Sequence, residues 1–258
     1  MTPGDADYQR DLSLVSPILL DRRHKQPKVD KMLSVLCAAG VIKFSGQASV
    51  RQGNAIDVGC SRGFFVEGLA PFYDTVIGAD IDSHALRLAQ SERSSENLLY
   101  IQGDSQCLPL SSGSIDLVIC NHVYEHVPSA EVLMDEILRI LKPGGVCYFG
   151  AASRLIIMEP HYHLPFLSWL PKALAHRYMR WFKRGDFYFE KLQTRRALAR
   201  LVQRFNIEDY TIEVLLDPDR FRARDMIPNG SLVEYVPRWI WRVAYPLLPT
   251  YILILRKS

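Results

Sequence analysis

The chain has 258 residues, of which 48% are hydrophobic and 23% are charged, and its mean hydropathy is −0.02. This composition is typical of a globular protein and excludes a wholly disordered chain, a collagen-like repeat and a disulfide-stapled miniprotein. The formal net charge of +3 is too small to indicate a nucleic-acid partner by itself.

The N-terminal part is polar. Residues 1–28 contain three prolines, which predicts an arm with little regular structure. A helix is expected over residues 29–39, and Gly40 suits its end. No basic segment followed by an apolar stretch opens the chain, so no secretory signal is expected.

The five cysteines and the C-terminal apolar segment indicate a cytoplasmic protein. The cysteine count is odd and no pair has CxxC spacing, so we expect reduced thiols and no metal site. Residues 239–255 are apolar but are interrupted by Arg242, Pro246 and Pro249, which makes them a poor membrane-spanning candidate.

From residue 55 onward, apolar segments alternate with helical patterns. Strands are predicted at 55–60, 75–81, 98–102, 115–120 and 146–151. Helices are predicted between them at 64–69, 83–92 and 129–141, with Ser83 as the N-cap of the second. Residues 142–145, Lys-Pro-Gly-Gly, are expected to end the third helix. This alternation predicts an α/β fold with a parallel sheet covered on both faces.

Such sheets bind ligands beyond the carboxyl ends of their strands, so the residues that follow each strand are the candidate site. Four strand ends carry polar or glycine residues in this position. The candidates are Asp57, Gly59, Cys60, Ser61 and Gly63 after the first strand, Asp80 and Ile81 after the second, Gly103, Asp104 and Ser105 after the third, and Asn121, His122 and His126 after the fourth.

The residue types at these strand ends suit a nucleoside ligand. Gly59 and Gly63 permit a tight turn and a close approach of the backbone to a ligand. Asp80 is placed where a carboxylate commonly accepts both hydroxyl protons of a ribose, although Asp82 shares or replaces that role in an alternative reading. Asp57 either contacts the ligand or orients the loop, and Asp104 either contacts the ligand or caps a turn.

Positions 55–153 resemble the class I S-adenosylmethionine-dependent methyltransferases, in the ubiquinone/menaquinone-type small-molecule branch. The matching segments are AIDVGCSRG, VIGADID, the stretch from IQGDSQCLPL to VYEHV, and the LKPGG turn. The resemblance implies a Rossmann-like sheet of seven strands, mostly parallel with an antiparallel last strand. It extends more weakly to a helix at 194–205 and to two last strands at 206–215 and 251–257.

The resemblance also implies the cofactor, S-adenosylmethionine, and roles for the strand-end residues. In that family the first loop wraps the methionine part, the acid after the second strand binds the ribose, and the Asp after the third reaches the adenine amine. These positions are the loop at 59–63, Asp80 and Asp104. Ser61 stands where the family often has a glycine.

A nicotinamide or flavin dinucleotide is the rival cofactor. That ligand needs GxGxxG spacing to seat a pyrophosphate at a helix N-terminus, and the loop here reads G-C-S-R-G. The sequence therefore favours the methyltransferase cofactor.

The segment from Arg154 to Arg204 lies outside the family core and carries the basic charge of the chain. Residues 1–153 hold 13 Lys and Arg against 18 Asp and Glu, whereas this segment holds 11 against 3 and nine aromatic residues. A helix is predicted at 172–182, with Leu174, Tyr178 and Trp181 along one side. We expect a helical lid that shapes the acceptor site or, alternatively, a helical cap with a solvated basic face.

One domain, residues 1–258, is expected to contain four segments. These are an N-terminal arm and helix at 1–45, a cofactor-binding core at 50–153, the lid or acceptor insertion at 154–193, and a C-terminal helix and strand pair at 194–258 with an insertion at 217–249.

Methyl transfer to a hydroxyl benefits from a general base, and histidine is the usual one near neutral pH. The candidate bases are His122, His126, His161, His163 and Glu159. Expected acceptor contacts are Glu159, His161, Tyr162, Phe166 and Trp169. The alternative for His126 is a structural role, in which its side chain forms a hydrogen bond with the backbone of the loop. The alternative for Tyr124 is packing in the core.

The sequence thus predicts methyl transfer to a small-molecule, lipid-linked or glycan-linked acceptor, most readily at a hydroxyl oxygen. A non-catalytic cofactor-binding or assembly protein of the same fold is the alternative. The basic aromatic segment suits contact with a membrane surface or an anionic acceptor, so a peripheral position at the inner membrane is compatible with a cytoplasmic protein. No nucleic-acid partner is expected, and the oligomeric state is left open.

Overall fold

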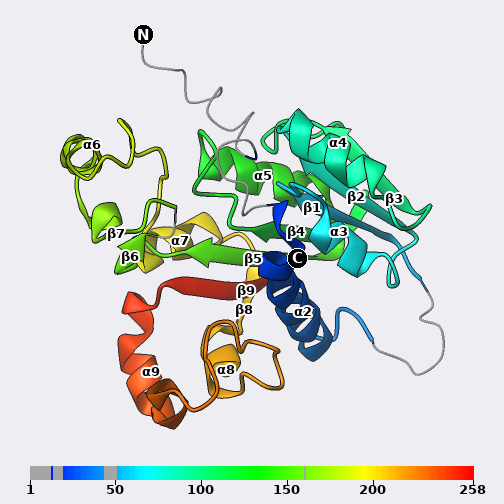
Figure 1. The fold of residues 1–258 in the computed structure, drawn as a ribbon. Coiled ribbons are helices and arrows are strands. Elements are labelled where there is room, and N and C mark those ends of the chain that lie inside the picture. The colour runs from blue at the N-terminus through cyan, green and yellow to red at the C-terminus, as the bar shows by residue number, and fades with distance from the viewer. Residues whose placement is uncertain (1–12, 14–19, 44–50, 160) are drawn as a thin grey trace.

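The computed structural model describes residue 13 and residues 20–43, 51–159 and 161–258 (Figure 1). Most of the arm expected at 1–28 lies outside the described residues. A seven-stranded sheet runs through the molecule in the order β3-β2-β1-β4-β5-β9-β8. Its strands are β1 (Asn54–Val58), β2 (Thr75–Asp80), β3 (Leu98–Gln102), β4 (Ile115–Asn121), β5 (Leu141–Ala152), β8 (Asn206–Asp209) and β9 (Thr250–Arg256).

Strands β1 to β5 pair in parallel, whereas β9 pairs antiparallel with both β5 and β8. The chain order places β1 beside β4 at the centre, so the two halves of the sheet diverge there. Ligands bind beside such a reversal of strand order in open α/β sheets. The predicted fold class, a mostly parallel sheet with an antiparallel last strand, is confirmed.

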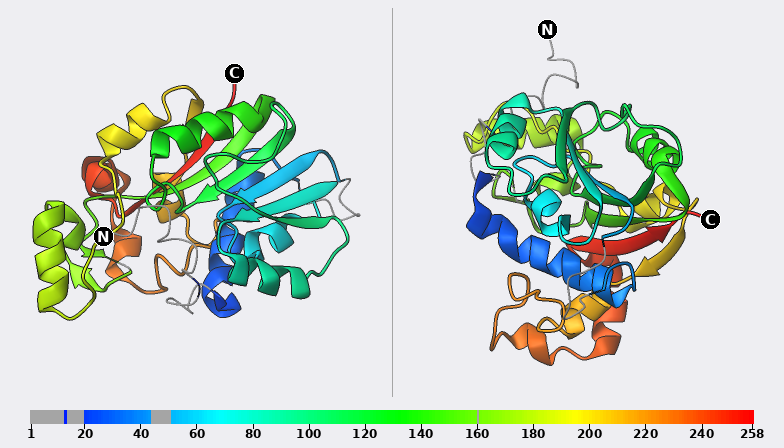
Figure 2. Two further views of the ribbon diagram at one scale, coloured as in Figure 1. Left: turned by 90° about the horizontal axis from the view of Figure 1, so that it is seen from above. Right: turned by 90° about the vertical axis from the view of Figure 1, so that its right-hand side faces the viewer.

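Helices cover both faces of the sheet (Figure 2). One buried cluster contains side chains of α2 (Arg22–Ala38), α3 (Phe64–Leu69), α4 (Ser83–Ser91) and α8 (Thr211–Leu216). The other contains side chains of α5 (Ala130–Ile140) and α7 (Arg195–Leu201). Because both faces are buried, the strands read as continuous apolar runs rather than as alternating ones.

The insertion after β5 forms a small structure of its own at one end of the sheet (Figure 1). It comprises β6 (Met158–Glu159), β7 (Leu164–Pro165), η2 (Leu167–Trp169) and α6 (Lys172–Trp181). A separate apolar cluster holds it together, made of Leu164, Leu167, Ala175, Met179 and Tyr188. The buried side of α6 is therefore the Ala175 and Met179 side, whereas Leu174 and Trp181 from the predicted stripe are exposed.

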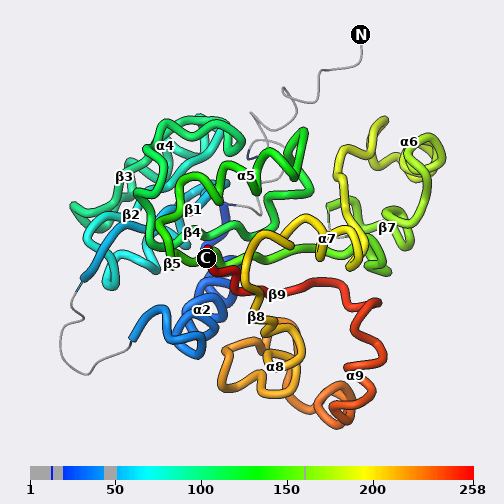
Figure 3. Tube along the Cα trace, turned by 180° about the vertical axis from the view of Figure 1, so that it is seen from behind, coloured from blue at the N-terminus to red at the C-terminus, as the bar shows by residue number. Residues whose placement is uncertain are grey.

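A second excursion lies between β8 and β9. It contains α8, η3 (Leu232–Tyr235), α9 (Arg238–Ala244) and η4 (Tyr245–Leu247). Figure 3 shows this excursion from behind, with α8 and α9 below the sheet. No helix in the described ranges is long and apolar enough to cross a bilayer.

The first helix begins seven residues earlier than the sequence predicts. The side chain of Asp21 accepts a hydrogen bond from the backbone N–H of Arg23 and so caps α2, which runs from Arg22. Pro27 lies inside this helix and removes one backbone donor. The helix persists because Val29, Met32 and Leu36 are buried on its inner side.

The strand predicted at 206–215 is wrong in its second half. β8 ends at Asp209, whose side chain accepts a hydrogen bond from the N–H of Thr211, and α8 begins there. Thr211, Val214 and Leu215 are the buried residues, and this spacing matches a helix rather than the alternation of a strand.

The Lys-Pro-Gly-Gly segment ends α5 as predicted but then lies within β5, which starts at Leu141 rather than Val146. A register shift accommodates the extra residues: Ile115 faces Leu141, and Leu117 already faces Val146. Gly144 has φ of 75°, which supplies the local bend.

Candidate active site

The loop after β1 is fixed to the end of β2. The backbone N–H groups of Gly59 and Cys60 both donate to the carbonyl of Ala79, at 2.8 and 3.1 Å. Gly59 has φ of 73°, and a Cβ on it would stand 2.8 Å from Cγ2 of Val123. Only glycine fits this position, because any side chain would be strained and would collide with the loop that follows β4.

Asp80, at the end of β2, forms a hydrogen bond with the backbone of this loop. Its Oδ2 accepts a hydrogen bond from the N–H of Ser61 at 2.6 Å, and its Oδ1 accepts one from the N–H of Asp82 at 2.9 Å. Each carboxylate oxygen has a second lone pair, so Asp80 can still accept two hydroxyl protons. Ser61 itself has φ of 49°, a conformation that glycine adopts more easily.

Both carboxylate oxygens of Asp82 accept hydrogen bonds from backbone N–H groups outside the glycine loop. It is buried, and its Oδ1 accepts hydrogen bonds from the N–H groups of His84 and Ala85, so Asp82 rather than the predicted Ser83 caps α4. Its Oδ2 accepts a hydrogen bond from the N–H of Ser13. These contacts favour Asp80 over Asp82 as the ribose ligand.

Asp57 and Lys25 interact electrostatically with one another near the end of β1. Asp57 is buried within β1, and its Oδ2 has no hydrogen-bond partner among the described residues. Burial and the charge of Asp80 raise the pKa of Asp57 well above its usual value. Burial lowers the pKa of Lys25 in α2 to about 8, although the charges of Asp57 and Asp80 oppose this.

Lys25 is a candidate that the sequence did not reveal. It belongs to the segment read as an irregular arm, and only the packing of α2 brings its ammonium group within electrostatic range of Asp57 and Asp80. A cation here complements an anionic ligand group beside the glycine loop.

The loop after β3 has a simpler geometry. Gly103 donates its N–H to the carbonyl of Asp80 at 3.0 Å, which ties this loop to the β2 end. Asp104 is exposed, and its Oδ1 accepts a hydrogen bond from the N–H of Gln106, so it caps the turn while leaving its other oxygen available. Ile81, Cys60 and Ser105 lie on the same loops, and Cys60 is buried.

The loop after β4 carries a buried carboxylate. His122 continues the ladder from Asn121 by donating its N–H to the carbonyl of Gly150, and its Nδ1 lies 3.2 Å from Oε1 of Glu125. Glu125 is 1% exposed. Although burial acts against it, the hydrogen bond with His122 and the nearby imidazoles hold the pKa of Glu125 below its usual value.

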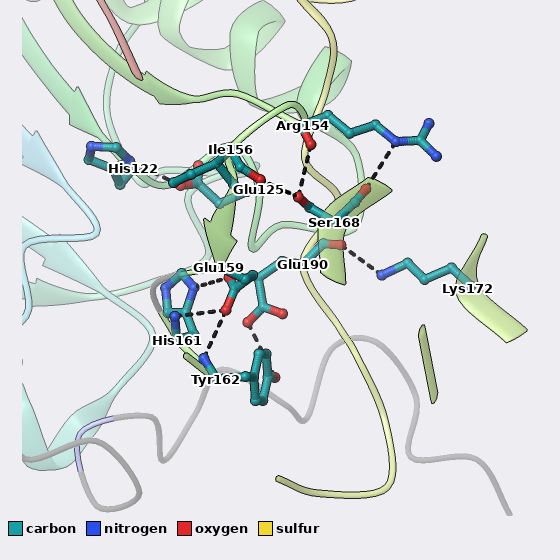
Figure 4. Close-up of polar contacts among 10 residues, drawn as sticks. All are labelled: His122, Glu125, Arg154, Ile156, Glu159, His161, Tyr162, Ser168, Lys172 and Glu190. Atoms are coloured by element: carbon teal, nitrogen blue, oxygen red, sulfur yellow. Dashed lines mark hydrogen bonds and ion pairs between the residues drawn. The ribbon is translucent and has the colours of Figure 1, made fainter. Parts of the chain in front are cut away.

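A second carboxylate and imidazole pair faces this loop from the insertion (Figure 4). Nδ1 of His161 lies 2.8 Å from Oε1 of Glu159, and Oε2 of Glu159 accepts hydrogen bonds from the N–H groups of His161 and Tyr162, each at 2.8 Å. Glu159 is fully buried, whereas 32% of the His161 side chain is exposed. Burial acts to lower the pKa of His161, but the bond to Glu159 and nearby carboxylates raise it above the usual value.

His126 joins the two loops. Its ring packs edge-on against the ring of His161, with centroids 5.1 Å apart. Nδ1 of His126 is buried and lacks a hydrogen-bond partner among the described residues, so its side chain does not bond backbone there. Burial lowers the pKa of His126, which keeps this ring neutral near pH 7.

The end of the insertion is bonded to the loop after β4. The N–H of Lys191 donates to the carbonyl of Glu125 at 2.8 Å, and the N–H of Gln193 donates to the hydroxyl of Tyr124 at 3.1 Å. The Tyr124 hydroxyl in turn donates to the carbonyl of Ala152 at 2.5 Å. Tyr124 therefore has a structural position between the core and the insertion.

Replacing Tyr124 by Phe is expected to lower the free energy of unfolding by about 1–3 kcal/mol, because it leaves the carbonyl of the buried Ala152 and the N–H of the part-buried Gln193 without this partner. Urea unfolding followed by circular dichroism measures this. Tyr235→Phe, which removes a hydroxyl from a 77% exposed side chain, is the matched control. Equal stability of the two variants would contradict the structural position.

Three residues expected near the acceptor are not gathered in this cluster. The side chain of His163 makes no bond to the described part of the chain, although its N–H donates to the carbonyl of Glu159. The rings of Phe166 and Trp169 pack on one another at 5.1 Å, and Nε1 of Trp169 donates to the carbonyl of Ile156. In contrast, Glu159, His161 and Tyr162 are joined by hydrogen bonds.

The residues at the strand ends fit S-adenosylmethionine. The buried Asp57 oxygen without a partner, the glycine loop, the free lone pairs of Asp80 and the Lys25 ammonium group match a nucleoside with a charged amino-acid tail. A parallel sheet with an antiparallel β9 and these loops is the arrangement expected of a class I methyltransferase domain that binds S-adenosylmethionine.

Comparison with known proteins supports the interpretation as a methyltransferase domain. Residues 56–149 match the family described as methyltransferase domain. A relative named ubiquinone biosynthesis O-methyltransferase, from Idiomarina loihiensis, is 27% identical over 172 residues, which are 62% of this chain and 64% of that relative. Residues 56–149 therefore form a methyltransferase domain, and the chain is similar to methyltransferases of the ubiquinone-type branch. It spans just under two thirds of the length of that relative.

Two solved structures have the same fold. A putative sarcosine dimethylglycine methyltransferase from Galdieria sulphuraria has a TM-score of 0.58 at 15% identity, covering 92% of this chain and 88% of that one. Geranyl diphosphate C-methyltransferase from Streptomyces coelicolor, crystallised with geranyl diphosphate and S-adenosyl-L-homocysteine, has a TM-score of 0.50 at 18% identity. That match covers 91% of this chain and 77% of the neighbour.

Proposed function

We propose that this protein transfers a methyl group from S-adenosylmethionine to a hydroxyl oxygen of a small or lipid-linked acceptor. The observation that carries the proposal is the Glu159 and His161 pair, which faces the loop after β4 beside His126. An imidazole with a raised pKa and a carboxylate behind it suits the removal of a hydroxyl proton. The relative from Idiomarina, by its name, is an O-methyltransferase.

The cofactor is assigned to the strand ends. Asp80 accepts the ribose hydroxyls, the loop from Gly59 to Gly63 surrounds the methionine part, and Asp104 reaches the adenine amine. Asn121, Ile81, Gly103 and Ser105 line the same edge. The sulfonium centre of the cofactor supplies an activated methyl group, so the chain has to position the acceptor and exclude water.

Glu159 orients the base. With Glu159 accepting from Nδ1–H, the neutral imidazole of His161 presents Nε2 as the acceptor of a proton. When the acceptor hydroxyl gives up its proton, the buried carboxylate stabilises the imidazolium that forms. His126 and His122, which belong to the core rather than the insertion, are the competing bases, and His163 has the weakest geometric support.

Lys25 is assigned to the carboxylate of the methionine part. Lys25→Met is expected to weaken S-adenosylmethionine binding about tenfold or more, because a hydrogen bond to a charged group contributes about 1.5–3 kcal/mol. In the wild type, affinity is expected to fall as the pH rises past the Lys25 pKa of about 8, since only the ammonium form binds an anion. Lys25→Met is expected to lose this pH dependence.

Isothermal titration calorimetry between pH 7 and 9 is the measurement, at roughly one-unit steps around that pKa. Arg23→Met, on the same helix but with a side chain 94% exposed, is the control and is expected to bind like the wild type. A Lys25→Met affinity equal to that of the control would remove Lys25 from the cofactor site.

The cofactor assignment is tested by comparing ligands. The wild type is expected to bind S-adenosylmethionine and S-adenosylhomocysteine, and to show no heat with NAD or FAD. Binding of a dinucleotide in their place would contradict the proposal.

A further inference from the structure

The helix α9 leaves its apolar side chains in solvent. It has no buried residue, although its sequence is Arg-Trp-Ile-Trp-Arg-Val-Ala. Six exposed side chains from η3, α9 and η4 form what we call the C-terminal apolar patch: Leu232, Tyr235, Trp239, Ile240, Val243 and Leu247. Exposed fractions of 86% for Leu232, 74% for Val243 and 65% for Trp239 are unusual for a water-facing helix.

Two basic side chains lie in the sequence between the residues of this patch. Arg238 and Arg242 are exposed within α9 and form no ion pair with the described part of the chain. By contrast, Arg224 in the same excursion pairs with Asp219 and Glu234. Exposed apolar residues with unpaired cations between them match the boundary between lipid tails and anionic headgroups.

The helix α6 presents a second surface of the same kind. Trp181 is 82% exposed and Phe182 is 51% exposed, and both follow Arg177 and Arg180 in the sequence. Figures 1 and 2 place α6 and α9 at the same end of the molecule, the end toward which β5 runs. This is the carboxyl end of the parallel strands, where the proposed cofactor and acceptor sites lie.

We propose that the C-terminal apolar patch, together with the exposed side of α6, docks on an anionic lipid bilayer. Trp239 and Tyr235 lie at the headgroup level, Val243 and Leu247 enter the acyl boundary, and Arg238 and Arg242 bind lipid phosphates. Docking turns the carboxyl ends of the strands toward the bilayer. That a lipid-linked acceptor enters from there rests on the proposed function, whereas the docking itself does not.

Charge favours a bilayer over a second copy of the chain. In a twofold dimer the same patch meets itself, and Glu234, the carboxylate within its segment, already pairs with Arg224, so the dimer would gather Arg238 and Arg242 of both copies without neutralising them. Anionic headgroups neutralise the same cations. A nucleic acid would also match the cations, but it offers nothing to the aliphatic side chains of Leu232, Val243 and Leu247.

Co-sedimentation of the full chain with lipid vesicles tests whether the C-terminal apolar patch docks on an anionic bilayer. We expect binding to vesicles of phosphatidylcholine with phosphatidylglycerol and little binding to phosphatidylcholine alone. The Arg238→Gln, Arg242→Gln double variant is expected to partition about 30-fold more weakly into anionic vesicles, since each basic residue near such a surface contributes about fivefold. Trp239→Ser with Val243→Ser is expected to abolish pelleting.

The matched control is Leu99→Ser, which changes a 47% exposed leucine on the outer strand β3 and is expected to pellet like the wild type. Each variant is also titrated with S-adenosylmethionine, and unchanged affinity separates loss of docking from loss of the fold or of the cofactor site. Failure of the wild type to pellet, equal pelleting on neutral vesicles, or full binding by both double variants would overturn the proposal. A dimer in light scattering that Trp239→Ser dissociates, without vesicle binding, would assign the patch to a second copy.

Discussion

Replacing His161 by Asn is expected to lower the rate of methyl transfer by about 10²–10⁴-fold, the usual contribution of a positioned proton acceptor. Affinity for S-adenosylmethionine is expected to stay within about twofold of the wild type, because His161 belongs to the insertion and not to the cofactor loops. Single-turnover measurement with methyl-labelled cofactor separates the chemical step from product release.

The pH dependence gives the Glu159 and His161 pair a signature. The base acts when neutral, so the rate rises with pH as it passes through the pKa of His161, which lies above the ordinary value of 6.5. Glu159→Gln removes the charge that raises this pKa, so the rising limb is expected to move to lower pH while the maximal rate falls. His163→Asn is the control and is expected to change neither.

Two results would contradict this assignment. A His161→Asn variant with the wild-type rate would show that the proton goes elsewhere or need not be removed. A large loss in His126→Asn with none in His161→Asn would move the base to the loop after β4, where His126 has a lowered pKa and an unpartnered Nδ1.

Replacing Asp80 by Ala is expected to weaken S-adenosylmethionine binding about a hundredfold or more, because two hydrogen bonds from the ribose to a carboxylate are lost and each contributes about 1.5–3 kcal/mol. The variant also frees the N–H of Ser61, so the glycine loop loses an anchor. Calorimetric titration measures the affinity, and thermal unfolding checks that the fold is kept.

Asp82→Ala is the matched control for Asp80→Ala. Its side chain caps α4, so its loss is expected to cost about 1 kcal/mol of stability but little cofactor affinity. If Asp82→Ala loses affinity and Asp80→Ala does not, the ribose ligand is Asp82, and the contacts described for these two carboxylates do not decide the role.

The core of the fold is readable from local patterns. The strands and helices from β1 to α5 lie within a few residues of their predicted bounds, because apolar runs and helical spacing report burial along a single segment. The strand-end glycines and carboxylates could be located in the same way. In a parallel sheet, the end of each strand is by topology at the ligand edge.

Features that depend on contacts between segments distant in the sequence could not be predicted from local sequence patterns. Nothing local distinguishes Lys25 from the other lysines of α2, and its electrostatic interaction with Asp57 and Asp80 depends on the packing of α2 against α3. The same holds for the contact of Glu125 with Lys191 and for the ring of His126 against His161. α8 was missed because its six residues, Thr-Ile-Glu-Val-Leu-Leu, are short and rich in β-branched side chains, a composition that also suits a strand.

The charges of the basic insertion are divided between its surface and its interior. Arg177 and Arg180 are exposed on helix α6. Two carboxylates of the insertion, Glu159 and Glu190, are buried. An acceptor next to His161 therefore meets carboxylates rather than cations. The basic residues instead belong to the outer surface, where the exposed apolar side chains of α6 and α9 also lie.

The central claim, methyl transfer from S-adenosylmethionine, is tested most directly by mass spectrometry. The purified protein is incubated with cofactor carrying a labelled methyl group and with a lipid and metabolite extract from cells that lack the gene, in which the unmethylated acceptor accumulates. The account predicts one labelled product, equimolar S-adenosylhomocysteine, and loss of both with His161→Asn. Tight binding of the cofactor without any labelled product or S-adenosylhomocysteine would contradict it and would identify a non-catalytic cofactor-binding protein.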